Sequence, residues 1–110
     1  MTYDEELAGR IRELVGSEHA LTEKKMFGGL GFLIGGNMAI AASWQGGLLV
    51  RVDPDQSDEL VETTPARPME MRGREMTGWL RVASDDVREQ PELARWVELG
   101  TTYAKSLPPK

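Results

Sequence analysis

The residues of this chain that could do chemistry are few, and their spacing points away from catalysis. There is no cysteine, and His19 is the one histidine, in a short polar segment. Nucleophilic catalysis therefore lacks a thiol and has one isolated base to draw on. Zinc and transition-metal sites lack their usual ligands. We expect a protein that is not an enzyme, and we assign no catalytic, cofactor-binding or metal-ligating residue.

The carboxylates are numerous, but their pairs fall at the beginnings of predicted helices or turns. These pairs are Asp53/Asp55, Asp58/Glu59 and Asp85/Asp86. Helix capping and interaction with the helix dipole already account for acidic residues at such positions. A small metal-dependent enzyme with a hard ion on Asp85 and Asp86 stays an alternative interpretation.

Gly29-Leu-Gly31 begins like a dinucleotide-binding fingerprint. That fingerprint needs a third glycine three residues later and a helix directly after the loop. Position 34 is Ile, and another β-like run follows. The paired glycines therefore indicate tight hairpin turns, which require positive φ angles.

The charge is unevenly distributed along the chain. The formal net charge is −5 and the pI is about 4.9, which argues against a nucleic-acid binder that works by bulk electrostatics. Seven cations nevertheless fall in the part of the chain that makes up the predicted sheet and its connections: Lys24, Lys25, Arg51, Arg67, Arg72, Arg74 and Arg81. Direct binding of nucleic acid or an anionic ligand is therefore one hypothesis, called the second hypothesis below. The residues that would bind are Lys24, Lys25, Arg72, Arg74 and Arg81.

Length and hydropathy indicate one ordinary globular domain over residues 1–110. The 110 residues can enclose a single modest core. No apolar run approaches the roughly 18 residues of a membrane span. The acidic N-terminus is unlike a secretory signal. We therefore expect a cytoplasmic protein without a membrane partner.

The periodicity predicts a helix, a four-strand meander, a helix, a hairpin and a final helix. Thr2 and Glu5 form a capping box for the first helix, over residues 3–15. Asp53 and Pro54 begin the second, over residues 54–62, and Pro91 opens the last. The predicted strands are 21–27, 30–34, 38–43, 48–52, 69–71 and 76–82. Gly35-Gly36-Asn37 and Gly73 lie at hairpin turns.

This order predicts an α+β fold: a two-layer α/β domain with an antiparallel sheet and helices on one face. Gly100 interrupts the apolar stripe of the last helix at a cost of about 1 kcal/mol relative to alanine. We therefore expect the last helix to approach the sheet or a partner closely at this residue.

Several blocks resemble the N-terminal domain of the TfoX/Sxy family of natural-competence regulators. They are Glu23-Lys-Lys-Met-Phe-Gly-Gly29, Gly36-Asn-Met38, Leu49-Val-Arg-Val52 and Trp96…Tyr103-Ala-Lys-Ser-Leu-Pro-Pro109. The resemblance covers nearly the whole chain. It implies a fold similar to type III secretion chaperones, and it offers no established catalytic residues. It also implies a stand-alone member, because the second, helical domain of the competence regulators has no counterpart before Lys110.

The resemblance implies a non-enzymatic regulatory or protein-interaction module, with a transcription factor as the expected partner and nucleic acid contacted indirectly. We expect the partner to contact the exposed sheet edge or the signature block. The candidate binding residues are Lys24, Lys25, Phe27, Gly28 and Gly29, with Arg72 and Arg74 from the second hypothesis. The alternative is that Met26, Phe27 and the glycines close the core and its turns. Homodimerisation through an open sheet edge is a further alternative.

Overall fold

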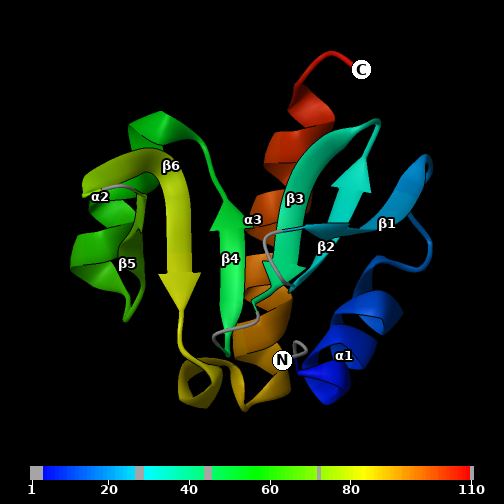
Figure 1. The fold of residues 1–110 in the computed structure, drawn as a ribbon, viewed down its shortest axis with the longest axis horizontal. Coiled ribbons are helices and arrows are strands. Elements are labelled where there is room, and N and C mark those ends of the chain that lie inside the picture. The colour runs from blue at the N-terminus through cyan, green and yellow to red at the C-terminus, as the bar shows by residue number, and fades with distance from the viewer. Residues whose placement is uncertain (1–3, 27–28, 44–45, 72, 110) are drawn as a thin grey trace.

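The computed structural model describes residues 4–26, 29–43, 46–71 and 73–109, and it has an α+β fold (Figure 1). The helices in this part of the chain are α1 (Glu5–Val15), α2 (Pro54–Thr63), the 3-10 helix η1 (Ser84–Val87) and α3 (Gln90–Ser106). The strands are β1 (Leu21–Met26), β2 (Gly29–Ile34), β3 (Asn37–Ala42), β4 (Leu48–Arg51), β5 (Arg67–Met71) and β6 (Arg74–Val82). The predicted order of elements is confirmed.

The six strands form one antiparallel sheet in the order β1-β2-β3-β4-β6-β5. The first four follow one another as the predicted meander. Gly35 and Gly36, with φ of 60° and 84°, make the turn between β2 and β3. The β5–β6 hairpin joins the sheet through its second strand, so that β6 pairs with β4. The edges of the sheet are therefore β1 and β5.

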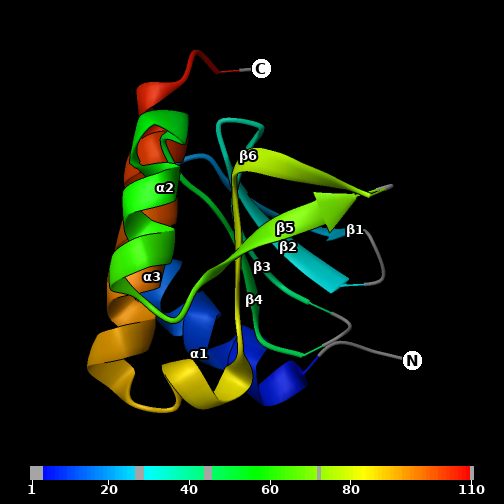
Figure 2. The ribbon, with the colours of Figure 1, turned by 90° about the vertical axis from the view of Figure 1, so that its left-hand side faces the viewer.

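The α-helices lie on one side of the sheet and leave the other face open (Figure 2). The core on the helix side includes Ile11 of α1, Phe32 of β2 and Trp96 of α3, each at most 2% exposed. A second, smaller apolar cluster lies on the open face and consists of Met38, Ala41 and Leu49, with Met69 and Trp79 packed against it. The predicted arrangement of helices on one face is confirmed.

Close packing of α3 explains the glycine in its apolar stripe. A Cβ at Gly100 would overlap the carbonyl oxygen of Ala39 in β3 and would lie 3.3 Å from Cγ1 of Val50. The helix backbone therefore sits directly on the sheet at this residue, as predicted.

The beginning of the first helix differs from the prediction. Asp4 is the N-cap, with φ −72° and ψ 105°, and its side chain accepts a hydrogen bond from the Leu7 amide at 3.1 Å. The predicted start at residue 3 and the capping box of Thr2 with Glu5 are therefore wrong, and Thr2 itself lies outside the described residues. Asp caps a helix at least as well as Thr, and its carboxylate also interacts favourably with the helix dipole.

The fifth strand begins earlier than predicted. The sequence places Arg67 and Pro68 in a loop, but β5 starts at Arg67. Pro68 is accommodated because β5 is an edge strand, where a missing amide donor need not break the ladder. This correction brings Arg67 into the sheet.

Candidate functional site

The two edges of the sheet differ in regularity. β1 pairs with β2 through six consecutive residue pairs, from Leu21↔Ile34 to Met26↔Gly29, without a register shift. β5 contains Pro68, and its register with β6 shifts between Pro68 and Met69. Proline and bulges are common protections of sheet edges against pairing with another chain. β1 has neither, so it is the edge better suited to accept a further strand.

The main chain of alternate β1 residues points outward. The Gly35 amide donates to the Ala20 carbonyl at 3.1 Å and extends the β1–β2 register by one pair. Hydrogen-bonded and non-hydrogen-bonded pairs alternate along an antiparallel ladder. The N–H and C=O groups of Leu21, Glu23 and Lys25 are therefore directed away from β2, toward the edge.

Charged side chains flank this edge. Arg12 of α1 donates two hydrogen bonds to the Glu23 carboxylate, at 2.7 and 2.8 Å, and these bonds lower the pKa of Glu23. Lys24 and Lys25 are exposed, and they make no side-chain hydrogen bond or ion pair within the described part of the chain. The edge therefore presents two uncompensated positive charges, since its carboxylate is already neutralised.

Lys24 and Lys25 project from opposite faces of β1. Lys24 is the register partner of Gly31, whereas Lys25 is the partner of Leu30, which belongs to the core on the helix side. Paired residues in a sheet share a face. A partner that contacts both lysines must therefore lie along the edge of β1 rather than on one face.

The structure places Gly29 and Arg74, two other predicted binding residues, apart from each other. Gly29 begins β2, and a Cβ there would overlap the Ala42 carbonyl oxygen, so close backbone packing explains this glycine. Arg74 begins β6 and is exposed, in the hairpin that forms the opposite edge from Lys24 and Lys25. Phe27, Gly28 and Arg72 lie outside the described residues.

A row of residues crosses the open face of the sheet through all six strands. The register pairs connect Lys24, Gly31, Ala41, Leu49, Arg81 and Arg67 in that order. Ala41 and Leu49 belong to the smaller apolar cluster, which identifies the face as the one without helices. Ala41 and Leu49 therefore form an apolar segment of the row, between Lys24 at one end and the two arginines at the other.

By register, the open face is basic. It carries four cationic side chains, Lys24, Arg67, Arg74 and Arg81, and Arg51 lies at its border, where it also contacts Tyr103 of α3. The carboxylates of the described strands, Glu23, Glu70 and Glu75, are on the opposite faces of their strands. These cations favour anionic groups at this face although the whole chain has a net charge of −5. The predicted basic set is not brought together as a whole, because Lys25 is on the other face and Arg72 lies outside the described residues.

Among the described residues, the ionisable side chains elsewhere show no arrangement typical of catalysis. Within the described ranges, no group of three or more His, Asp or Glu residues is placed to hold a metal ion. Asp85 is bound to Arg88 at 2.7 Å, and His19 is exposed in the α1–β1 connection. In the same part of the chain, none of the helices has the length and apolar character needed to cross a membrane.

Comparison with models of protein families shows the family of this chain. Residues 13–104 match the model of the TfoX N-terminal domain. The chain belongs to the TfoX N-terminal domain family. The match begins within α1, includes the whole sheet and ends near the end of α3. Comparison with curated proteins gives no match, and comparison with solved structures gives none either.

Membership of the TfoX N-terminal domain family suggests a regulatory module related to competence. The family is not known for enzymatic activity. The match also covers β1 and both lysines, which were the main candidates from the sequence.

Proposed function

We propose that this protein is a non-enzymatic regulatory module that acts by binding a protein partner, and that the partner adds as a strand to the free edge of β1. The single observation that carries this proposal is the contrast between the two sheet edges. β1 is regular and directs the main-chain groups of Leu21, Glu23 and Lys25 outward, whereas β5 is interrupted at Pro68. Strand addition to a free edge is a recurring way in which domains bind peptides.

The charges at this edge favour an acidic partner segment. Arg12 already neutralises Glu23, while Lys24 and Lys25 have no partner in the described residues. An incoming strand has side chains on both faces of the sheet. Acidic residues at neighbouring positions of that strand would therefore meet Lys24 on the open face and Lys25 on the helix side.

A second copy of the chain fits the same edge less well. Antiparallel pairing of β1 with itself around a twofold axis places Glu23 opposite Glu23, or it places Lys24 opposite Lys24 with a Glu23–Lys25 pair on either side. Each of these arrangements contains at least one like-charge pair at its centre. Like charges directly opposite one another destabilise a strand pair. The charge pattern therefore favours a partner with a different sequence.

The proposal is tested with the purified protein and the cyclic-AMP-responsive transcription factor of the source organism, because the competence regulators that the chain resembles act with such a factor. We expect saturable binding in calorimetry. The variant Lys24→Glu/Lys25→Glu should bind at least about tenfold more weakly, because both attractive contacts become repulsive. Lys25→Pro should also weaken binding, because it removes an outward-directed amide and leaves the β1–β2 ladder intact.

Arg95→Glu is the matched control, because Arg95 is an exposed cation on α3, away from the edge. It should leave the affinity unchanged, and all variants should keep the melting temperature of the wild type. Equal affinity of the wild type and both β1 variants would contradict binding at this edge. Absence of binding by the wild type would remove this transcription factor as the partner.

A further inference from the structure

Two arginines lie opposite each other on neighbouring strands, at the far end of the sheet from the β1 edge. Arg67 of β5 and Arg81 of β6 are direct register partners, which places their Cβ atoms about 4.5–5.5 Å apart. Neither side chain makes a hydrogen bond or ion pair with another described residue. Such a like-charge pair is unfavourable for the fold alone, and an anion bound between the two guanidinium groups would relieve the repulsion.

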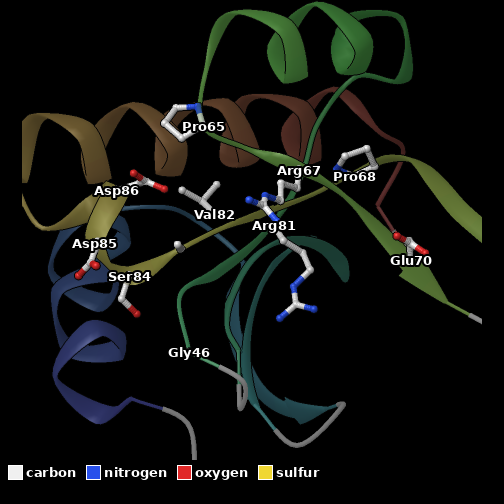
Figure 3. Close-up of a pocket in the computed structure, with 11 residues that line it drawn as sticks. Gly46, Pro65, Arg67, Pro68, Glu70, Arg81, Val82, Ser84, Asp85 and Asp86 are labelled. Carbon is white, nitrogen blue, oxygen red and sulfur yellow. The ribbon is translucent and has the colours of Figure 1, made fainter.

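The two arginines also line a hollow in the described part of the structure. This hollow has a volume of about 960 Å³, which is within the usual range for small-ligand sites. Figure 3 shows Arg67 and Arg81 on neighbouring strands, with Asp85 and Asp86 of the η1 segment on one side and Glu70 on the other. The remaining lining residues are Gly46, Pro65, Pro68, Val82, Ala83 and Ser84.

The carboxylates of the hollow limit what it can bind. Asp85 already has Arg88 as a partner at 2.7 Å, which leaves Asp86 and Glu70, at opposite walls of the hollow, as its other carboxylates. A polyanion such as nucleic acid would bring several charges against these carboxylates. A small molecule with one oxyanion group and a cationic group avoids that repulsion, because its cationic end can face Asp86 or Glu70.

We propose that the hollow at Arg67 and Arg81 is a binding site for a small zwitterionic metabolite, whose phosphate or carboxylate group bridges the two guanidinium groups. The planar guanidinium group of arginine can donate two parallel hydrogen bonds, and this geometry fits the oxygen atoms of either a phosphate or a carboxylate group. The proline residues on β5 and in the segment before it restrict the backbone of one wall. This site is independent of the β1 edge, which lies at the other side of the sheet.

The test is an NMR titration of the ¹⁵N-labelled full chain, followed through the backbone amide and side-chain Nε signals of Arg67 and Arg81. The probes are phosphoethanolamine, β-alanine, ethanolamine and a short DNA duplex. We expect saturable shifts at both arginines with phosphoethanolamine or β-alanine, and the stronger of the two identifies the oxyanion as phosphate or carboxylate. Ethanolamine, which has no anionic group, should leave these signals unchanged.

The variants Arg67→Gln and Arg81→Gln keep most of the side-chain length and remove the charge. Each should weaken probe binding at least tenfold, and each should fold as well as the wild type because the repulsion between the arginines is gone. Arg74→Gln is the control, since Arg74 is an exposed arginine of β6 outside the hollow. Its probe affinity should equal that of the wild type.

Three results would overturn the proposal. The first is the absence of saturable shifts with either zwitterion, and the second is equal affinity in the wild type and the Arg81→Gln variant. The third is tighter binding of the DNA duplex with an affinity that falls steeply with salt, which would indicate a nucleic-acid surface instead. None of these results bears on the β1 edge, so failure of this site and failure of the proposed partner binding are distinguishable.

Discussion

The guanidinium group of Arg51 lies over the ring of Trp79, 5.2 Å from its centroid, and also 5.6 Å from the ring centroid of Tyr103. Arg51 and Trp79 are register partners on β4 and β6, whereas Tyr103 belongs to α3. The pairing of β3 with β4 ends at Ile40↔Val50, and the two strands diverge beyond it (Figure 1). At this divergence the Arg51 side chain connects the sheet to the last helix.

The interaction of Arg51 with Trp79 should be measurable as a coupling energy. In a double-mutant cycle of Arg51→Ala and Trp79→Leu, we expect a coupling of about 0.5–1 kcal/mol, because both side chains are partly buried. Urea unfolding followed by far-UV circular dichroism gives the four free energies of unfolding without relying on tryptophan fluorescence. Additive effects of the two substitutions would show that the stacking contributes no stability.

Gly100 and Gly9 give a matched pair of helix substitutions with opposite expected signs. In α3, Gly100→Ala gains about 1 kcal/mol of helix propensity, but the new Cβ would overlap the Ala39 carbonyl oxygen. We expect a net destabilisation of about 1–3 kcal/mol, as for other overpacked positions. In α1, a Cβ at Gly9 meets no atom within 4 Å, so Gly9→Ala should stabilise the fold by about 0.5–1 kcal/mol.

Thermal and urea unfolding of both variants measure this difference. A neutral or stabilising Gly100→Ala would mean that α3 can move away from the sheet without loss. Equal effects of the two substitutions would assign both to helix propensity alone and would contradict the close approach of α3 to β3.

The local parts of this fold could be predicted from the sequence, because short-range signals specify them. Gly35 and Gly36 fix the β2–β3 turn, and Asp53 with Pro54 fixes the start of α2. The position of β6 beside β4 could not be predicted, since the hairpin residues define their own pairing but not their distant neighbour. The register of β2 with β3 shifts between Phe32 and Leu33, and both Ala39 and Ile40 are buried in the core. This shift could not be predicted either, because a regular two-residue alternation would place neighbouring residues on opposite faces.

The candidate site was predictable in part for similar reasons. The sequence indicates that Lys24 and Lys25 are exposed on an edge strand. It did not lead to the prediction that they lie on opposite faces of β1, although the two-residue alternation of strands requires this. Arg67 was counted among the cations of the sheet region but was not placed in a strand, because Pro65 and Pro68 indicated a loop. The tolerance of edge strands for proline was the signal that could have placed Arg67 opposite Arg81.

Asn37 should anchor the segment that follows α3. Its side-chain Nδ2 donates to the Pro108 carbonyl at 2.9 Å, and the residue is only 3% exposed. Asn37→Ala should cost about 1–2 kcal/mol in the free energy of unfolding and should speed hydrogen exchange at the Leu107 amide. Ser106→Ala is the control, since its exposed hydroxyl bonds the nearby Tyr103 carbonyl, and it should change stability by less than about 0.5 kcal/mol.

The ion pair of Arg12 with Glu23 predicts a specific dependence of stability on pH. The hydrogen bonds and the charge of Arg12 lower the pKa of Glu23 below its usual 4.5, and partial burial opposes them. Because the pKa is lower in the folded state, the pair stabilises the fold above the unfolded-state value. That stabilisation is lost as the pH falls through the folded-state pKa.

The substitution Glu23→Gln isolates this contribution, because the variant lacks the titrating group. We expect the wild type to exceed it in unfolding free energy at pH 7 by less than about 1 kcal/mol, since the two side chains are 51% and 33% exposed. The difference should shrink between about pH 6 and pH 3 and also in high salt, which screens exposed charges. Urea unfolding of both proteins across this range measures it. A difference that stays constant with pH would show that Glu23 contributes through packing or edge polarity rather than through its charge.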